Sequence, residues 1–302
     1  MKIAILMSTY NGEKYINKQL ESLFNQKVDG HMTIYIRDDG SSDSTIEIIK
    51  RWKEKLDIVL YEESNVGPAK SFWKLFMKED IQADYYAFCD QDDVWDSSKV
   101  QTGIFALQNE DSEALWCSNC RIIDQRGTVI SEKMNKESPN FSIISQMVCG
   151  TTQGCTMLFN DQLRRYIIEK NVKIIPMHDF VIMTYAIAKG NVLYDNYPYL
   201  GYRVHSNNVI ACDGKNIVKH IRNSLNIWFS SSHRNELSNF AVVFLRDNSD
   251  YLDMETQKYI NNLVKSKHNI MARLELVLDK KTVSQNKKAQ RSFKIRTILG
   301  II

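Results

Sequence analysis

The chain has 302 residues, of which 43% are hydrophobic and 25% are charged, a composition typical of a soluble globular protein. Its formal net charge of +3 is too small to indicate a nucleic-acid partner. The first residues, MKIAILMSTYNG, hold too short an apolar run for a signal peptide, and no segment approaches the roughly 18 apolar residues of a membrane span. These features predict a cytoplasmic protein with one large domain, or a domain and an appendage.

Residues 1–110 alternate between short apolar runs and segments with helical spacing. The runs KIAILMS, MTIYIRD, DIVLYEE and DYYAFCD are typical of buried strands. The segments between them carry apolar residues three and four positions apart, the spacing of an amphipathic helix. Ser44 and Glu47 have the spacing of a capping box before one of these helices. The alternation predicts an α/β fold with a parallel sheet.

Polar residues follow each of these four predicted strands. The loops are STYNGEKY, DDGSSDS, ESNVGPAKS and DQDDVW. Loop chemistry alone would also favour Gly, Asn and Asp in each of them. In parallel α/β sheets, however, ligands bind beyond the carboxyl ends of the strands. Four such loops in succession therefore favour a polar binding site at this edge of the sheet.

Asp90, Asp92 and Asp93 place three carboxylates within four residues, and crowded carboxylates repel each other unless a cation lies among them. Carboxylate oxygens select Mg²⁺, Mn²⁺ or Ca²⁺. An EF-hand loop starting at Asp90 is excluded, because its sixth residue is Trp95 rather than Gly and its twelfth is Gln101 rather than Glu. The alternative, a cap for the next helix, is weaker because later residues are better placed for it. We therefore predict a metal site.

The pair Asp38 and Asp39 ends the second predicted strand, and two interpretations are open. One of the two carboxylates could bind a base or ribose. A turn that needs acidic side chains only for its own hydrogen bonds explains the pair equally well. Asp43, further along the same loop, is placed to cap the following helix.

Residues 111–212 have a mixed pattern, and the rest of the chain is helical. We expect a hairpin around DQRGTVI, a strand GCTMLFN, a helix through HDFVIMTYAIAKG, and strands NVLYDN and YLGYRVH. Beyond this point IVKHIRNSLNIWF, NELSNFAVVFLRD and DMETQKYINNLVKSKHNIMARLELVLD have helical spacing. We predict an α/β domain over 1–212 and a helical C-terminal region over 213–302.

Seven stretches together resemble a known family: STYNGEKYINKQLESLFNQ, IRDDGSSDST, NVGPAKSF, FCDQDDVW, GCTMLFN, HDFVIM and YRVHSNNV. In this order and spacing they are similar to the inverting family 2 glycosyltransferases, and most similar to the bacterial rhamnosyltransferase-like branch. The resemblance covers roughly residues 1–210. It implies a GT-A fold, with a Rossmann-like nucleotide-binding half over 1–110 and an acceptor-binding half over 111–212.

The resemblance also implies a role for individual residues. It places the following residues around the nucleotide: Thr9, Tyr10, Asn11, Glu13, Asp38, Asp39, Asp90 and Gln91. Asp92 becomes the direct metal ligand of an Asp-x-Asp motif, and His205 a further ligand or diphosphate contact. Asp179 matches the catalytic base. The acidic residue that usually precedes this base is replaced by His178, for which a structural and a functional role both stay open.

The implied reaction moves a sugar from a nucleotide donor to an acceptor hydroxyl, with Mn²⁺ or Mg²⁺ as cofactor. The first donor to test is dTDP-L-rhamnose, and the implied acceptor is a growing cell-surface polysaccharide or a lipid-linked oligosaccharide. A UDP-hexose donor and a non-catalytic sugar-nucleotide-binding scaffold are the alternatives. A nucleotidyltransferase is disfavoured, because STYNGEKY lacks the Gly-rich basic loop expected after its first strand.

Basic residues gather near the end of the chain, before TILGII. They are Lys280, Lys281, Lys287, Lys288, Arg291, Lys294 and Arg296. A solvated helix or a disordered tail would explain them. The alternative is peripheral contact with anionic lipid at the inner face of the cell membrane, where each basic residue near the surface contributes roughly 1 kcal/mol.

Overall fold

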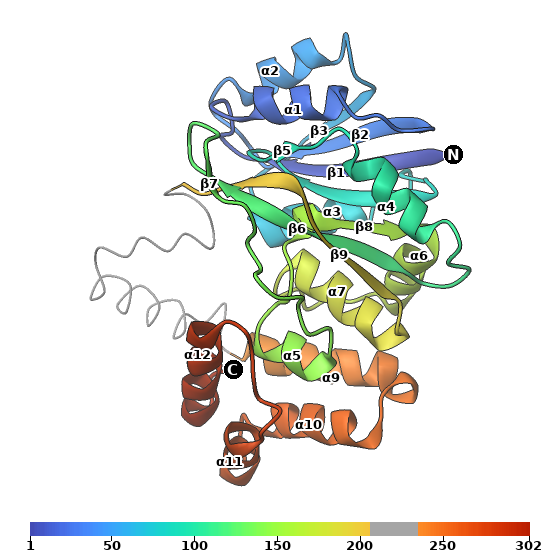
Figure 1. Cartoon of the computed structure of the whole chain (residues 1–302). Coiled ribbons are helices and arrows are strands. Elements are labelled where there is room, and N and C mark those ends of the chain that lie inside the picture. Colours follow the sequence, from blue (N-terminus) through green and yellow to red (C-terminus); the bar gives the residue numbers. More distant parts are fainter. Residues whose placement is uncertain (206–234) are drawn as a thin grey trace.

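A nine-stranded mixed sheet runs through the chain, in a computed structural model that describes residues 1–205 and 235–302 (Figure 1). The strands are β1 (Lys2–Thr9), β2 (His31–Asp38), β3 (Ile58–Glu62), β4 (Tyr85–Asp90), β5 (Val94–Trp95), β6 (Leu115–Ile123), β7 (Val129–Ser131), β8 (Met157–Asn160) and β9 (Val192–Arg203). Their order is β3-β2-β1-β4-β8-β6-β9-β5, with β7 paired to β6. The first four strands are mutually parallel, as predicted.

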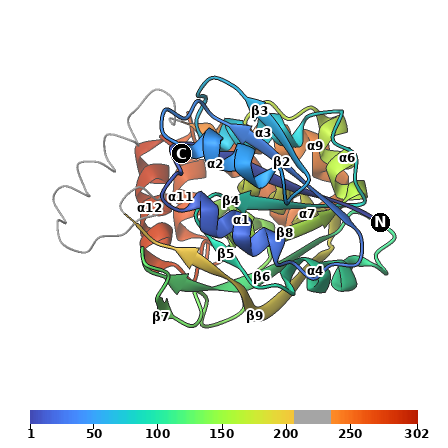
Figure 2. The same cartoon turned by 90° about the horizontal axis from the view of Figure 1, so that it is seen from above.

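Helices cover both faces of this sheet and continue beyond it. They are α1 (Ile16–Phe24), α2 (Thr45–Trp52), α3 (Pro68–Phe76), α4 (Lys99–Leu107), α5 (Ile143–Val148), α6 (Asp161–Lys170), α7 (His178–Lys189), α9 (Glu236–Asn248), α10 (Met254–Lys265), α11 (Ile270–Leu278) and α12 (Lys287–Leu299). Two short 3₁₀ helices span Gly154–Thr156 and Ser249–Tyr251. Viewed from above, α1 and α2 lie over the parallel part of the sheet (Figure 2).

The alternation of side chains along the strands builds two separate cores. In β1, Ala4 and Leu6 pack into one cluster, and Ile3 and Ile5 into the other, because successive strand residues point to opposite faces. The helices α1, α2 and α4 cover the second cluster, whereas α3, α6 and α7 cover the first. The same alternation places Cys117 and Cys120 on opposite faces of β6.

The structure confirms two further predicted elements and corrects two others. The hairpin at 124–128 and the helix α7 are confirmed. NVLYDN and YLGYRVH form one continuous strand, β9, rather than two. The Ser44 side chain makes no capping hydrogen bond. Its backbone N–H instead donates to Glu13 Oε2 at 3.0 Å, because a neighbouring loop supplies the acceptor.

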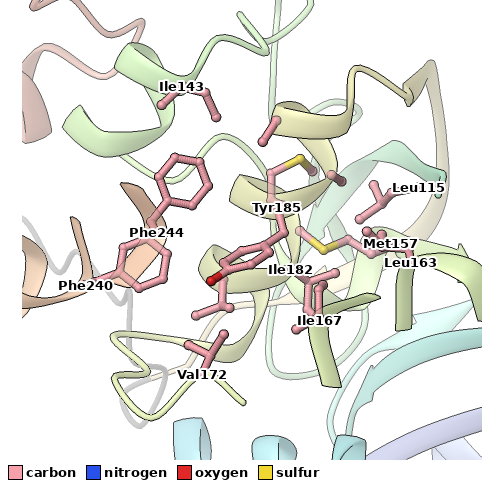
Figure 3. Close-up of a cluster of buried hydrophobic side chains, with 14 of the residues drawn as sticks. Leu115, Ile143, Met157, Leu163, Ile167, Val172, Ile182, Tyr185, Phe240 and Phe244 are labelled. Carbon is pink, nitrogen blue, oxygen red and sulfur yellow. The ribbon is translucent and has the colours of Figure 1, made fainter. Parts of the chain in front are cut away.

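The C-terminal helices share a core with the α/β part of the chain. Figure 3 shows Phe240 and Phe244 of α9 facing Tyr185 of α7, whose hydroxyl donates to Asp247 Oδ2 at 2.7 Å. The run predicted to be helical over 253–279 forms two helices, α10 and α11, because the Asn269 side chain caps a new helix start. The predicted helix IVKHIRNSLNIWF, the domain division at residue 212 and Cys212 lie outside the described residues.

No helix within 1–205 and 235–302 is both long and apolar enough to cross a bilayer. The five cysteines in these ranges carry free thiols: Cys89, Cys117, Cys120, Cys149 and Cys155.

Candidate active site

The carboxyl ends of β1, β2 and β4 meet at one edge of the sheet. The parallel register sets Thr9 opposite Asp38 and Ser8 opposite Asp90. The loops that follow these strands therefore lie side by side, although the residues they carry are far apart in sequence. This is the edge at which the sequence predicted a polar site.

The carboxylate of Asp38 is buried and its oxygens are used within the protein. Thr9 Oγ1 donates to Asp38 Oδ1 at 2.9 Å, and the N–H groups of Gly40 and Ser41 donate to Asp38 Oδ2 at 3.1 and 2.7 Å. The Ser41 hydroxyl also donates to Oδ1 at 2.6 Å. These bonds fix the turn after β2. They therefore support the interpretation of Asp38 as a residue that stabilises its own turn.

Asp39 is also buried, and it joins the end of β2 to the loop before α3. Its carboxylate accepts from the guanidinium of Arg37 and from the N–H groups of Val66 and Gly67, both at 2.9 Å. Gly67 has a φ of +83°, a left-handed conformation that favours glycine. The NVG sequence thus presents two adjacent amides to one carboxylate.

Gln91 ties the acidic loop to the loop after β1. Its side chain accepts from Tyr10 N at 2.9 Å and donates to Tyr10 O at 3.0 Å. A Cβ on Gly12 would stand 2.2 Å from Gln91 Oε1, so a larger residue there would displace the Gln91 side chain from this position. Asn11 Oδ1 accepts from Ser42 N at 2.8 Å and fastens the same loop to the turn after β2.

Several residues predicted around a nucleotide therefore have side chains that bond to neighbouring loops. They are Thr9, Asn11, Glu13, Asp38, Asp39 and Gln91. Tyr10 takes part through its backbone, and its side chain is exposed. Their contact with a nucleotide stays a prediction.

Asp90 lies within a group of crowded carboxylates. Burial raises its pKa to about 7, and the negative charges of Asp92 and Asp179 add to that rise. Burial, followed by Asp92 and Asp90, holds the pKa of Asp93 well above its ordinary value. Ligand atoms of Asp90, Asp93 and Cys155 all lie within 4.8 Å of one another. The site thus concentrates carboxylate groups, with the buried Lys99 interacting electrostatically with Asp93.

The predicted metal ligands Asp92 and His205 are in direct contact. His205 Nε2 lies 2.6 Å from Asp92 Oδ2, and the His205 ring stacks on Tyr15 with the centroids 5.1 Å apart. Arg203 Nε donates to Asp92 O at 2.7 Å, and Asp93 Oδ1 accepts from Arg203 N at 3.0 Å. The end of β9 is thereby fixed to the acidic loop.

These residues fit a divalent cation. Carboxylate oxygens suit Mn²⁺ and Mg²⁺, and burial together with the neighbouring carboxylates raises the pKa of Asp90 and Asp93. Asp93 Oδ2 is buried and has no hydrogen-bond partner among the described residues. Burial raises the pKa of the Cys155 thiol, which therefore stays protonated beside Asp93 rather than serving as a thiolate ligand.

Asp179 lies in the first turn of α7 and is oriented by two backbone amides. Its Oδ1 accepts from Phe180 N at 2.7 Å, and its Oδ2 accepts from Gly154 N at 3.0 Å. The amide dipoles at a helix start stabilise a carboxylate there. A Cβ on Gly154 would lie 3.2 Å from Asp179 Cβ and 2.8 Å from His178 Nε2, so the close packing requires glycine.

His178 is packed as an aromatic ring. It stacks on Phe72 with the centroids 4.0 Å apart and meets the edge of Phe88 at 4.7 Å. Burial lowers its pKa to about 4, against the opposing effect of Asp179, so the imidazole is neutral near pH 7. The geometry favours the structural interpretation of this residue.

Three residues of the site were not predicted. Arg203 and Tyr15 occur within stretches that carried the family resemblance, but no pattern showed that they would contact the acidic loop or His205. Lys99 is fully buried at the start of α4, with Nζ 3.6 Å from the ring centroid of Trp95, and burial lowers its pKa to about 8. A lysine at a helix start gives no sequence signal for burial, because lysine is normally exposed.

Comparison with known proteins now bears on this geometry. The family model described as Glycosyl transferase family 2 matches residues 4–170, more than half of the chain. The chain belongs to this family. It is 27% identical over 276 residues to the dTDP-rhamnosyl transferase RfbG of Shigella flexneri, covering 85% of this chain and 91% of RfbG. It is 25% identical over 154 residues to the poly(ribitol-phosphate) beta-N-acetylglucosaminyltransferase TarS of Staphylococcus aureus, covering 50% of this chain and 26% of TarS.

Solved structures show the same fold. A crystal structure of a TarS fragment from S. aureus aligns with a TM-score of 0.63 at 16% identity, covering 100% of this chain and 81% of the fragment. The mannosyltransferase PcManGT of Pyrobaculum calidifontis, in complex with GDP-Man and Mn²⁺, aligns with a TM-score of 0.55 at 15% identity, covering 99% of this chain and 73% of that one. The predicted family, GT-A fold and enzyme class are confirmed.

Proposed function

We propose that this glycosyltransferase moves a hexosyl residue from a nucleotide donor to a hydroxyl of a growing saccharide, with inversion at the anomeric carbon. The first donor to test is dTDP-L-rhamnose, because RfbG, which is similar along most of both chains, is described as a dTDP-rhamnosyl transferase. The acceptor we propose is a cell-surface polysaccharide chain or its lipid-linked precursor.

One observation carries the proposal: the residues suited to a cation and the residue suited to a base share one site. Ligand atoms of Asp90 and Cys155 lie within 4.8 Å of each other, and Gly154, which precedes Cys155, donates its N–H to Asp179 Oδ2 at 3.0 Å, so the carboxylates of β4 and α7 are near each other. Asp90 in turn adjoins the contact between Asp92 and His205. A sugar nucleotide needs both functions, one at its diphosphate and one opposite its anomeric carbon.

The proton transfer falls to Asp179. As the acceptor oxygen forms its bond to the anomeric carbon, the bond from that carbon to the diphosphate breaks and its electron pair leaves with the diphosphate. The acceptor hydroxyl loses its proton, and Asp179 takes it. The amides of Gly154 and Phe180 keep this carboxylate in one orientation. The attack comes from the face opposite the diphosphate, so the product has inverted configuration.

The cofactor we propose is Mn²⁺ or Mg²⁺, held by Asp92 with His205 and Asp90 beside it. When bound it would supply positive charge against the leaving diphosphate. Arg203 and Gln91 hold the loop that carries Asp92, through the bonds to Asp92 O and to the Tyr10 backbone. Their part is to keep the acidic loop in place before the donor arrives.

A thermal-shift screen of sugar nucleotides tests the donor. We expect dTDP-L-rhamnose to stabilise the protein in the presence of Mn²⁺, by about 2.7 kcal/mol at 100 times its dissociation constant. UDP-hexoses and GDP-mannose are the comparison donors, and EDTA removes the cation. Stabilisation by a UDP-hexose instead would replace the donor but keep the reaction. If a donor binds but no transfer or donor hydrolysis follows, the chain is a binding scaffold and the proposed reaction is wrong.

A further inference from the structure

Two adjacent helices near the end of the chain expose an unusual number of large apolar side chains. Their exposed fractions lie between 46% and 77%. On α11 they are Ile270, Met271, Leu274 and Leu278, and on α12 they are Ile295, Ile298 and Leu299. Single exposed apolar residues are normal on a protein surface, but a cluster marks an interaction site. We call these seven side chains the apolar face.

The residues of α11 in the apolar face share one side of the helix. Ile270, Leu274 and Leu278 recur every four residues, so they line up along the helix. Ala272 and Leu276 are buried and point to the opposite side, toward the core. The apolar side chains of α11 therefore point away from the rest of the described structure.

Hydrogen bonds join α11 and α12 side by side. Arg273 Nη1 donates to Ile298 O at 3.3 Å, and Lys294 Nζ donates to Val277 O at 2.8 Å. These contacts pair the start of α11 with the end of α12, so the two helices are antiparallel. The two parts of the apolar face are thereby held on neighbouring helices, with no described element between them.

The basic residues near the end of the chain divide into two groups. Lys294 and Arg273 bond to backbone carbonyls, and Arg296 is largely buried, so these hold the helices together. Lys280, Lys287, Lys288 and Arg291 are exposed, and so is Lys281, which forms an ion pair with Glu255. Lys280 follows the end of α11. Lys287, Lys288 and Arg291 lie in the first two turns of α12, on the same solvent-exposed side of the helix as Ile295 and Ile298. The apolar face is thus bordered by free cationic side chains.

The charge of this part of the chain differs from that of the rest. Residues 270–299 hold eight Lys or Arg against two Asp or Glu, a net charge of +6. The whole chain has 39 against 36, so the remainder holds 31 against 34, a net charge of −3. A cationic, apolar surface on an otherwise slightly acidic protein fits an anionic apolar partner.

We propose that the apolar face of α11 and α12 docks on an anionic lipid bilayer. Amphipathic helices with basic polar sides lie in the membrane interface, with apolar side chains among the acyl chains and basic groups at the phosphates. A second copy of this chain fits less well, because a twofold interface would set the same cationic residues against each other. The face binds lipid whether or not the proposed reaction is correct.

The helices of the apolar face lie on the same side of the molecule as the candidate active site. The N-terminus marks the start of β1 on the right of Figures 1 and 2, so the carboxyl ends of the parallel strands point to the left. The helices α11 and α12 lie on the left in both views. A protein docked through them has its candidate active site on the side where a membrane-anchored acceptor would be.

Vesicle co-sedimentation of the full chain tests the proposal. We expect binding to vesicles of phosphatidylglycerol and phosphatidylcholine at low salt, weakened by added salt, and much weaker binding to phosphatidylcholine alone. The triple variant Ile270→Ser, Leu274→Ser, Leu278→Ser removes apolar contact without changing charge and should weaken binding at least tenfold. Lys287→Gln, Lys288→Gln, Arg291→Gln should weaken it about 100-fold, since each basic residue contributes about 1 kcal/mol.

The matched control is Phe105→Ser with Ile130→Ser, two exposed apolar residues on α4 and β7. This control should bind vesicles as the unmodified protein does. All the substituted residues are exposed, and unchanged melting temperatures will show that the variants are folded. Absence of binding to anionic vesicles at low salt would overturn the proposal. So would unchanged binding by the serine variant, or a dimer in analytical ultracentrifugation that this variant dissociates.

Discussion

Two pairs of adjacent aspartates follow strands of the same sheet, yet their surroundings differ. Asp38 and Asp39 are buried, and backbone amides, hydroxyl groups and the Arg37 guanidinium donate to their oxygens. Asp92 and Asp93 lie in a crowd of negative charge, and Asp93 Oδ2 has no partner among the described residues. Donors reach all four carboxylate oxygens of the first pair. In the second pair His205 contacts Asp92 Oδ2 and Arg203 N donates to Asp93 Oδ1, so Asp93 Oδ2 is the oxygen that the described residues leave without a donor.

A run of acidic residues therefore does not by itself indicate a cation site. What distinguishes the acidic loop after β4 is that burial and like charges raise the pKa of Asp90 and Asp93. A carboxylate that lacks donors in the protein must obtain positive charge from a ligand or stay protonated. Substitutions at the two pairs should therefore have opposite consequences for stability and for ligand binding.

Asp179 shares features of both pairs. Two backbone amides donate to its carboxylate, as donors do to Asp38, but its charge also contributes to the raised pKa of Asp90. Asp179→Asn keeps the shape of the side chain but cannot accept the proton. We expect turnover to fall 10²- to 10⁴-fold, the usual contribution of a general base, or about 3–5 kcal/mol of barrier. Donor and cation binding should persist, since their residues lie on other loops. Turnover within threefold of the unmodified enzyme, with chemistry rate-limiting, would show that Asp179 is not the base.

Asp38→Ala tests how much the hydrogen bonds of the first pair contribute to stability. Its removal leaves buried donors of Gly40, Ser41 and Thr9 without their acceptor, so we expect the free energy of unfolding to fall by about 3 kcal/mol. Urea denaturation without added metal gives the value. Asp92→Ala is the matched control, because it relieves repulsion instead, and its stability should stay within about 1 kcal/mol of the unmodified protein. Equal losses in the two variants would remove the distinction between the pairs.

The parallel half of the sheet and the edge of the site could be predicted from the sequence. The apolar runs of β1, β2 and β4 show where strands end, and parallel pairing then requires their loops to meet. The contacts of Arg203 could not be predicted, because they depend on β9 returning beside β5 and the acidic loop, a long-range pairing that leaves no periodic signal. The family resemblance supplied the residues of YRVH but not their partners.

The end of the chain shows a second limit. Its basic residues look alike in the sequence, which favoured a solvated helix or a disordered tail and kept a lipid contact as the alternative. In the structure Arg296 is largely buried and Lys294 bonds to Val277 O, while Ile302 is buried in the core with α9. Helical spacing over 13 residues cannot tell which side faces the core when both sides carry lysine, arginine and isoleucine.

His178 gives a pH test beside the carboxylates. Its pKa is about 4 in the folded protein and about 6.5 when unfolded, so the unfolded state binds more protons between these values. The contribution of His178 to stability is therefore full above pH 6.5 and falls as the pH drops toward 4. At pH 5 the loss should be about 2 kcal/mol. Asp90, whose folded pKa is raised to about 7, acts in the opposite direction over this range, so the total curve hides the effect.

The measurement is consequently a difference between two proteins. The free energy of unfolding of His178→Phe, minus that of the unmodified protein, should become more positive by about 2 kcal/mol between pH 7.5 and pH 5. The exposed His268, substituted by Gln, is the control for loss of an imidazole. A difference that does not change with pH would mean that His178 is solvated rather than packed between Phe72 and Phe88.

The smallest expected effect concerns the cation itself, at Asp92. In the unmodified protein, Mn²⁺ at 100 times its dissociation constant should add about 2.7 kcal/mol to the free energy of unfolding. Asp92→Ala removes a carboxylate that touches His205, and a tenfold or greater loss of affinity would cut this stabilisation to about 1.4 kcal/mol or less at the same concentration. Asp111→Ala removes the same charge from an exposed loop before β6, at the opposite edge of the sheet, and should keep the full stabilisation. If Mn²⁺ stabilises all three proteins equally, the cation binds elsewhere, and protons rather than a metal ion neutralise Asp90 and Asp93, as the raised pKa values of these two residues allow.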